Sequence, residues 1–435
     1  MEIQLPFNFI AFMLFLYSIF LLFKGWKKSA TLKEHQRFPP TPWKLPLIGN
    51  LHHLVGALPH RSLKKLAEKY GPIVHLKLGE VSVIVVSSAE LAKEVLKVQD
   101  PACADRPQTI VSKIMLAAFG KVIRDRDMLL SLLKKAVPMT GGFGLEDLFP
   151  SFKLLHVISW NKLKLLAMRR KLDVILDAIV DEHRSNLATT DNGNGDFGGE
   201  DIVDVLLRIK ESGDQDIAIT IDNIKAIIFD MFSAGTETSS TTIDWAMAEL
   251  MRNPSVMAKA QTEIREALKG KKTIDDNDIR TLKYLKFIIK ETLRLHAPIP
   301  LLPRACKKEC EVAGYTIPLK AKVSVNVWAI GRDPEYWHEP ESFKPERFEG
   351  NSIEFTGNDF EFIPFGAGRR ICPGINYGLA NVELCLAQLL YYFDWKLPKG
   401  MNPNDLDMAE TKGLAVSRKN SLLLVPTSYN PPIDG

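Results

Sequence analysis

The longest apolar run of the chain lies at its N-terminus. Residues 5–23 are apolar, interrupted only by Pro6, Asn8 and Ser18. A helix of these 19 residues, at about 1.5 Å rise per residue, just spans the hydrocarbon core of a bilayer. The first lysines follow the run, and the positive-inside rule then keeps the rest of the chain in the cytosol. We therefore expect residues 1–24 to form a single-pass membrane anchor; the alternative is a cleaved signal peptide.

After the anchor, the spacing of apolar positions predicts mostly helices. An alternating pattern over residues 73–87, with a turn at Gly79, predicts two short strands. The pattern is mostly helical from Asp201 to about residue 296, and a further helix is expected over residues 375–392. The expected fold class is mainly α with a small β part.

A stretch rich in lysine and proline lies between the anchor and these elements. Residues 25–50 contain two early lysines and then the sequence FPPTPWKLPLIGN. The prolines favour stiff, extended backbone, so we expect a hinge that sets the angle of a globular domain to its anchor. The remaining residues, 51–435, are expected to form that domain, since a chain with 46% hydrophobic residues can bury a large core.

Charge and cysteine content narrow the class of protein. The chain has 56 basic and 52 acidic residues, a net charge of +4. This excess is too slight for the dense basic face that nucleic-acid binding requires, so we expect no nucleic-acid partner. The five cysteines are odd in number, and the chain is long for a disulfide scaffold, so we expect free thiols in a reducing compartment.

One of these cysteines, Cys372, lies in the sequence PFGAGRRICPG, residues 364–374. The glycines permit backbone shapes closed to other residues and let a flat group approach closely. Arg369 and Arg370 place positive charge beside the thiol, and Pro373 is suited to the first turn of a following helix. A thiol at a helix N-terminus beside arginines favours its thiolate form. The alternative for a single cysteine is a buried structural thiol.

The full spacing, F-x-x-G-x-R-x-C-x-G over residues 365–374, resembles the haem-binding loop of the cytochrome P-450 family. The resemblance implies a cytochrome P-450 fold, with haem b as cofactor and Cys372 as the thiolate ligand of its iron. It also implies that Arg370 faces a haem propionate, that Phe365 packs near the sulfur and that Gly366 belongs to the cofactor site.

A second segment with an unusual pattern lies inside the longest helix candidate, residues 220–253. Its middle, SAGTETSSTT, is rich in glycine and hydroxyl residues, which are poor helix formers. The Thr238 hydroxyl is placed to bond the Ala234 carbonyl four residues back and to open the helix. The segment resembles the oxygen-binding segment of the family, which implies that Thr238 and Glu237 are catalytic and help to deliver protons. The alternative is an ordinary helix with a polar stripe.

Two further motifs imply structural and cofactor roles. Glu291 and Arg294 stand three apart in a predicted helix, away from the lysine face formed by Lys283, Lys286 and Lys290. The pair resembles the Glu-x-x-Arg motif of the family, with Arg347 as the third member of a structural triad; the alternative is a surface salt bridge worth about 0.3 kcal/mol. The resemblance also implies that Arg304, in the sequence PLLPR, reaches a haem propionate, whereas the alternative is a surface arginine.

The resemblance extends over almost the whole chain and has a substrate implication. It is strongest to plant microsomal members, and among them to the terpene hydroxylases, such as limonene hydroxylases and sesquiterpene oxygenases. It implies an apolar small-molecule substrate, and a pocket lined by residues 298–302, Ala234 and part of 413–417, all mostly small or apolar. It further implies O₂ as co-substrate, electrons from NADPH through NADPH-cytochrome reductase, and a place in the endoplasmic reticulum membrane with the catalytic domain in the cytosol.

One departure from the family pattern follows Met115. Members of the family carry a helix with a Trp-Arg-x-x-Arg pattern in this region, but no tryptophan occurs between Trp43 and Trp160. Several tens of residues, including one wall of the haem pocket, are absent. Three functions therefore stand side by side: a monooxygenase, an oxygen-independent haem-thiolate isomerase, and a truncated, non-catalytic form that does not hold haem properly. Thr238 in its Ala-Gly-x-x-Thr setting favours oxygen chemistry over the isomerase.

Overall fold

The structure, a computed structural model, describes residues 37–107, 145–151, 160–190, 201–212, 219–271 and 273–429. The expected anchor, residues 1–24, lies outside these ranges, as do residues 25–36 of the expected hinge and Met115. Among the described residues, no helix combines the length and the apolar character needed to cross a bilayer. The described part is mainly helical with a small β part, as the sequence predicts.

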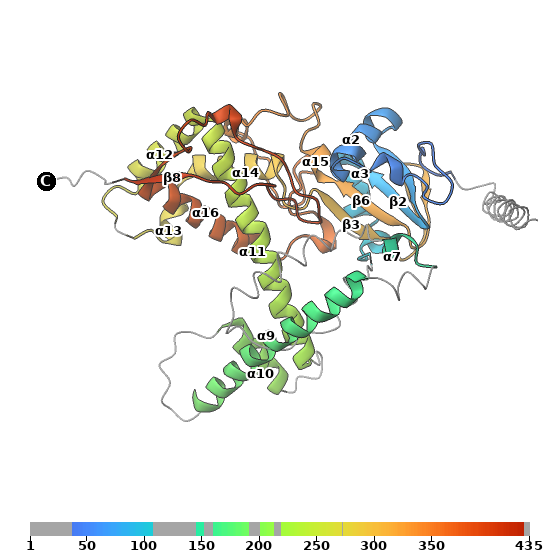
Figure 1. The fold of residues 1–435 in the computed structure, drawn as a ribbon, viewed down its shortest axis with the longest axis horizontal. Helices are drawn as coiled ribbons and strands as arrows, with labels where there is room; N and C mark the ends of the chain where they lie inside the picture. Colours follow the sequence, from blue (N-terminus) through green and yellow to red (C-terminus); the bar gives the residue numbers. More distant parts are fainter. Residues whose placement is uncertain are drawn as a thin grey trace, which may run out of the picture.

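A four-stranded sheet lies at one end of the described fold (Figure 1). Its order is β1-β2-β6-β3, in which only β2 and β6 are parallel. The predicted hairpin is present, and Gly79 turns between its strands with φ of +60°, a conformation that suits glycine. The strands are Ile73–Leu78 (β1), Val81–Val86 (β2), Leu301–Ala305 (β3) and Lys322–Asn326 (β6).

Short elements surround this sheet and lead into the cysteine loop. α2 packs on β1 and β6, and α15 packs on α2 and β3. These elements are 3₁₀ turn η1 (Leu51–His53), α2 (Pro59–Tyr70), α3 (Ala89–Lys93), π-helical turn η2 (Glu94–Val98), α4 (Asp100–Cys103), α7 (Leu145–Leu148), β4 (Cys310–Val312), β5 (Tyr315–Ile317), α15 (Val327–Ile330), and 3₁₀ turn η5 (Gly368–Arg370). A further 3₁₀ turn, η4 (Pro345–Phe348), packs in the helical core described next.

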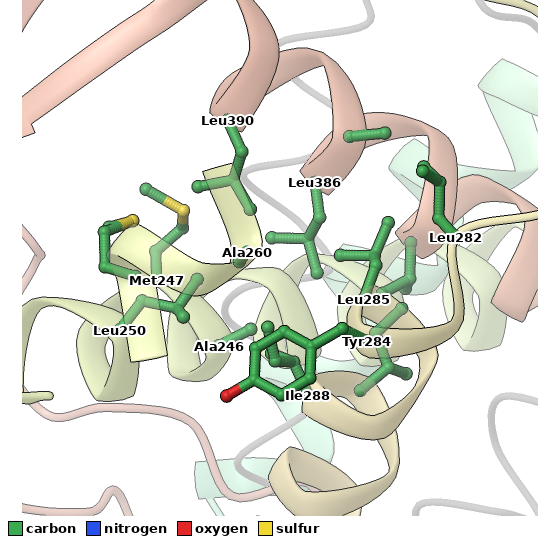
Figure 2. Close-up of a cluster of buried hydrophobic side chains, with 14 of the residues drawn as sticks. Ala246, Met247, Leu250, Ala260, Leu282, Tyr284, Leu285, Ile288, Leu386 and Leu390 are labelled. Carbon is green, nitrogen blue, oxygen red and sulfur yellow. The ribbon is translucent and has the colours of Figure 1, made fainter. Parts of the chain in front are cut away.

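Four helices form the largest hydrophobic core. Figure 2 shows Ala246 of α11, Ala260 of α12, Leu285 of α14 and Leu386 of α16 within this cluster; all four are fully buried. The small alanines let the helices approach closely while the leucines fill the space between them. The elements here are α11 (Ile221–Arg252), α12 (Pro254–Ala267), α13 (Asp276–Ile279), α14 (Lys283–Leu295), α16 (Ile375–Tyr392), β7 (Phe393–Lys396), η6 (Pro403–Asp405) and β8 (Val425–Ser428).

The long helix α11 joins two separate cores. Its C-terminal half belongs to the large core, whereas its N-terminal half packs with α9 (Trp160–Thr190) and α10 (Ile202–Glu211) in the lobe at the bottom of Figure 1. The middle of the helix, residues 233–240, contributes to neither cluster and is partly or fully exposed. The polar segment singled out in the sequence is therefore the part of α11 that lies between the two cores.

The described part of the expected hinge, residues 37–50, packs against the sheet. Asn50 is fully buried, and its side-chain amide donates to the carbonyls of Pro42 and Trp43, at 3.0 Å each. Its side-chain oxygen accepts the Lys77 backbone N–H at 2.8 Å. These bonds satisfy a buried amide and hold the proline segment on β1.

Candidate active site

The loop around Cys372 depends on two glycines with left-handed backbone. Gly366 and Gly368 have φ of +74° and +71°. A Cβ at Gly368 would lie 1.9 Å from the Leu96 carbonyl oxygen in η2, so only glycine lets the loop approach this turn. Gly374 does not share this role, because its φ of −93° is open to any residue.

Cys372 lies directly before helix α16. Its backbone N–H donates to the Phe365 carbonyl at 3.0 Å, which closes the loop on itself. Its side chain is partly exposed and is a free thiol, and its Sγ has no hydrogen-bond partner among the described residues. The helix begins at Ile375, so Pro373 precedes the helix and is not in its first turn, contrary to expectation. The thiol still lies at the helix N-terminus, where partial positive charge gathers.

Arg304 and Arg370 meet beside this loop. Arg304 lies on β3 and is 7% exposed, so it is not a surface arginine. Its guanidinium donates to the carbonyls of Pro303 at 3.0 Å and Arg370 at 3.5 Å, but no described carboxylate lies within ion-pair distance. Burial lowers the pKa of Arg304, the nearby cations Arg106 and Arg370 lower it further, and only Asp100 opposes them.

These features fit an anionic, flat cofactor. A buried guanidinium without a carboxylate partner is costly, and a propionate would supply the missing charge. Gly366 faces the same guanidinium, since a Cβ there would lie 3.8 Å from Arg304 Nη2. The unpartnered Cys372 sulfur, the left-handed glycines and the buried cation are the features that a haem-thiolate site requires on this side of the cofactor.

The polar segment of α11 keeps its helical form. Thr238 Oγ1 donates to the Ala234 carbonyl at 2.5 Å, the bond that the sequence suggested. The helix nevertheless runs unbroken from Ile221 to Arg252, so this bond does not open it as expected. Ala234 is exposed, Thr238 is partly exposed, and the partly exposed carboxylate of Glu237 has no partner among the described residues.

This segment of α11 also meets the helix that follows the cysteine. A Cβ on Gly235 would lie 3.9 Å from the Tyr377 ring, and one on Gly378 would lie 3.8 Å from Ser239 Oγ. Small residues on both helices thus allow close contact between α11 and the first turn of α16. Cys372 and the polar turn are held by two helices that pack on each other.

Glu291, Arg294 and Arg347 form one buried network. Arg294 donates to both carboxylate oxygens of Glu291, at 2.7 and 2.8 Å, and both side chains are fully buried. Arg347 Nε donates to the same carboxylate at 2.9 Å. Arg294 also donates to the carbonyls of Gly331, Pro340 and Ser342. The predicted contacts are present, and they join α14 to the loop that ends in η4.

Sequence reasoning missed the segment that supports the cysteine loop from the other side. Asp100 pairs with Arg369 at 2.8 Å, and the Ala104 carbonyl accepts Arg370 Nε at 3.0 Å. The π-helical turn η2 ends two residues before Asp100 and presents the Leu96 carbonyl to Gly368. Turns of this kind recur at functional sites, but no pattern in a single sequence predicts them.

Comparison with known proteins agrees with this geometry. The sequence profile of the family described as Cytochrome P450 matches residues 39–120 and 109–425. Premnaspirodiene oxygenase of Hyoscyamus muticus is 47% identical over 98% of this chain and 99% of its own length. Cytochrome P450 71D13 of Mentha piperita is 49% identical over 99% of this chain and 100% of its own length. The 5-epiaristolochene 1,3-dihydroxylase of Nicotiana tabacum is 45% identical over 98% of this chain and 99% of its own length.

The comparisons also locate a gap in this chain. The alignment with premnaspirodiene oxygenase extends over 500 residues, although the chain has 435 and aligns 98% of them, so about 70 positions of that relative have no counterpart here. The two matches to the family profile meet at residues 109–120, around Met115. The chain therefore belongs to the cytochrome P450 family, whose members are monooxygenases that bind haem b through a cysteine thiolate, and it lacks an internal segment that its relatives possess.

Proposed function

We propose that this protein hydroxylates an apolar terpenoid, using O₂ and electrons that pass from NADPH through NADPH-cytochrome reductase. The observation that carries the proposal is the unpartnered Cys372 thiol at the start of α16, in a loop beside the buried, carboxylate-free Arg304. Haem b, when bound, supplies the activation of O₂ for insertion into an unreactive C–H bond. The chain supplies the ligand, the charge partners and the placement of substrate.

Each residue of the site has a distinct task in this proposal. Cys372 is the thiolate that holds the iron, with its backbone fixed to Phe365. Arg304 and Arg370 neutralise the propionates, because a buried cation is stabilised by an anion that it contacts. Thr238 and Glu237 lie on the partly exposed turn of α11. The Thr238 hydroxyl donates to the Ala234 carbonyl and can still accept a hydrogen bond, and the Glu237 carboxylate has no partner among the described residues, so the pair can hold and pass protons.

Two segments that were expected to line the substrate pocket lie together. The Val416 backbone N–H donates to the Pro298 carbonyl at 2.8 Å, which ties residues 413–417 to the approach to β3. The side chains of Val416 and Leu302 are buried and apolar. A terpenoid substrate is supported by this apolar character and by the names of two relatives, premnaspirodiene oxygenase and 5-epiaristolochene 1,3-dihydroxylase.

The site of action in this proposal is the endoplasmic reticulum membrane. Residues 1–24 anchor the chain by a single span, and the lysines that follow keep the catalytic domain in the cytosol. This places the domain on the same side as the reductase and at the surface from which an apolar substrate partitions. The hinge connection is supported by residues 37–50, which pack on β1 through Asn50.

A second function is favoured by the missing segment. About 70 positions of a close relative are absent beside Met115, and they include the region of the family's Trp-Arg-x-x-Arg helix. In this second function, the chain without that wall of the pocket does not hold haem and is a non-catalytic, membrane-tethered form. The two functions differ in whether the expressed chain retains haem.

Turnover with a matched pair of threonine variants tests the monooxygenase. Thr238 and Thr262 make the same bond to the carbonyl four residues back, but Thr262 lies on the exposed face of α12. We expect Thr238→Ala to lower product formed per NADPH by about tenfold or more, with peroxide released instead, while Thr262→Ala changes nothing. The assay uses membranes that contain the reductase and a panel of terpene hydrocarbons.

Haem content is measured beside the product formed per NADPH, because it decides how the turnover result is interpreted. Equal coupling in the two variants would remove the proton-delivery role of Thr238. No product from any terpenoid, with haem retained, would overturn the substrate class. Loss of haem from the unsubstituted chain would instead favour the non-catalytic form.

A further inference from the structure

Three of the five cysteines converge at the edge of the sheet, away from Cys372 in the sequence. Cys103 ends α4, Cys306 follows β3, and Cys310 begins β4. The sulfur of Cys103 lies 2.9 Å from that of Cys306 and 3.5 Å from that of Cys310. All three sulfurs lie within 4.8 Å of one another, and all are free thiols.

The backbone holds the three thiols in place. The Lys307 N–H donates to the Ala102 carbonyl at 2.9 Å, and the Ala305 N–H donates to the Asp105 carbonyl at 2.8 Å. These bonds set Cys103 and Cys306 against each other across two chain segments. The N–H and carbonyl of Cys306 are themselves paired, to Ala321 and Lys320. The main-chain groups of Cys306 are therefore already paired, and its sulfur is left to contact the other two sulfurs of the cluster.

The cluster is closed on one side and open on the other. Cys103 and Cys306 are 1% and 2% exposed, whereas Cys310 is partly exposed. An ion can therefore enter past Cys310 and be held by two buried sulfurs behind it. Solvent reaches the partly exposed Cys310 and would supply a water as fourth ligand, the arrangement of zinc sites that have three protein ligands.

We propose that Cys103, Cys306 and Cys310 form a binding site for a thiophilic divalent metal ion, Zn²⁺, separate from the haem site. Two thiolates on one tetrahedral zinc lie about 3.8 Å apart, given Zn–S bonds of about 2.3 Å. The Cys103–Cys310 separation of 3.5 Å is close to this value, and metal binding would have to widen the Cys103–Cys306 contact of 2.9 Å by rotation of a side chain. Binding replaces three thiol protons with one ion and releases those protons to solvent.

The local charges balance such a site in part. Lys308 contributes a positive charge near Cys310, and Asp100 contributes a negative charge near Cys103. Three thiolates around Zn²⁺ leave one net negative charge, less than three separate thiolates would carry. A disulfide is the competing chemistry, but it would join only two of the three sulfurs and would need an oxidant in a reducing compartment.

The site also has a structural consequence for the cofactor pocket. Cys306 follows Arg304 by two residues, and Cys103 immediately precedes Ala104, whose carbonyl accepts Arg370. A metal ion that joins Cys103 to Cys306 would therefore fix the two segments that carry the cation-rich side of the haem site. Metal binding to the three cysteines can be measured without catalytic turnover.

Metal binding to the full-length chain in detergent tests the proposal. The protein is reduced, stripped of metal and titrated with Zn²⁺ against a chromophoric chelator, and Co²⁺ is used to report thiolate ligands by their charge-transfer bands. We expect one zinc per chain. Cys306→Ser and Cys310→Ser should weaken binding by about 100-fold or more and remove part of the cobalt–thiolate band.

Two controls separate this cluster from the remaining cysteines. Cys385→Ser removes an exposed thiol of α16, and Cys372→Ser removes the thiol of the haem loop; both should keep one zinc and the full cobalt band. Cys310→Ser keeps the test valid if the buried Cys306→Ser fails to fold. The proposal is overturned if reduced protein binds no zinc, or if Cys310→Ser binds zinc as tightly as the unsubstituted chain.

Discussion

At the scale of single residues, the most informative side chain is a buried cation without a counter-charge. Arg304 is 7% exposed, and no described carboxylate lies within ion-pair distance of it. Burial and two neighbouring arginines disfavour its charge, so it is a cost to the free protein. This free-energy cost is explained if Arg304 pairs with an anionic group of the cofactor.

The substitution Arg304→Met should therefore act in opposite directions on two measurements. Removing an unpaired buried cation should leave the haem-free protein as stable as before or about 1 kcal/mol more stable, as seen in chemical unfolding. The same change should lower haem occupancy several-fold, as measured by absorbance. Arg184→Met is the control, since Arg184 is an exposed residue of α9, and both readouts should barely change. A destabilised free protein with normal haem content would contradict this role.

At the scale of elements, α14 is held by a network that a single helix cannot provide. The two carboxylate oxygens of Glu291 accept hydrogen bonds from Arg294, from Arg347 and from the backbone N–H of Lys344. The Glu291 side chain is fully buried, so water does not reach these oxygens. The network ties α14 to the segment before η4, and that segment leads to the cysteine loop. The carboxylate at its centre compensates the buried guanidinium of Arg294 and that of Arg347, whose side chain is 11% exposed.

Neutralising that carboxylate should be severely destabilising. Glu291→Gln keeps the shape but leaves Arg294 and Arg347 without a counter-charge, and we expect a loss of about 3–5 kcal/mol in the free energy of unfolding. Glu68→Gln is the control: Glu68 pairs with Lys64 at 3.9 Å, is 63% exposed, and should cost about 1 kcal/mol or less. Thermal unfolding of both variants measures the difference. Similar losses in the two would show that the network is a surface salt bridge in energetic terms.

A second link between elements should make the fold sensitive to acid. Burial acts to raise the pKa of Glu410, but His60 and Arg61 of α2 outweigh it and lower the pKa to about 2. A depressed carboxyl pKa stabilises the fold above the unfolded value of 4.5, and this contribution disappears as the pH falls from about 4.5 to about 2. Glu410→Gln should therefore be less stable than the unsubstituted chain at pH 7, by up to about 3 kcal/mol.

The difference between the two proteins should narrow as the pH falls. Urea unfolding at pH 7 and pH 3.5 measures the free energy of unfolding of both proteins. The other titrating groups are the same in the two proteins, so their contributions cancel in the difference. Glu341→Gln is the control, because Glu341 pairs with Arg332 but is 64% exposed. If the difference in free energy of unfolding between the unsubstituted chain and Glu410→Gln stayed constant with pH, Glu410 would be excluded as the acid-sensitive link.

The sequence predicts some elements closely because their ends are marked chemically. The helix expected over 220–253 is observed as Ile221–Arg252, with Thr220 capping its start through the Asn223 N–H and Pro254 beyond its end. The helix expected over 375–392 is observed with those bounds. A side-chain cap and a following proline mark the ends of α11, whereas α16 has no side-chain cap at its start, so only the first helix owes its bounds to such local signals.

Other features depend on distant contacts and could not be predicted. Lys290 was assigned to a solvent face by helical spacing, but it is buried, since Glu354 and the Ile353 carbonyl bond its ammonium. The convergence of Cys103 with Cys306 joins residues that are 203 positions apart. The Leu96 carbonyl that faces Gly368 likewise becomes visible only in the fold.

At the scale of the whole molecule, helix α11 connects two hydrophobic cores and carries the polar turn of the candidate active site between them. α11 runs from the lobe formed with α9 and α10 to the large core around α14 and α16 (Figure 1). Its polar turn lies between these cores, beside the start of α16 and the loop of Cys372. The segment that relatives possess near Met115 is absent from this arrangement. The central claim is that the remaining residues still hold haem through Cys372.

A reduced carbon-monoxide difference spectrum of the expressed, membrane-inserted chain tests this claim most directly. The comparison is between the unsubstituted chain, Cys372→Ala, and Cys385→Ala, which removes an exposed thiol of the following helix. We predict a thiolate-type Soret band that is present in the unsubstituted chain and in Cys385→Ala and lost in Cys372→Ala. A chain that is inserted and soluble in detergent but gives no such band, or a band that survives Cys372→Ala, would contradict the claim.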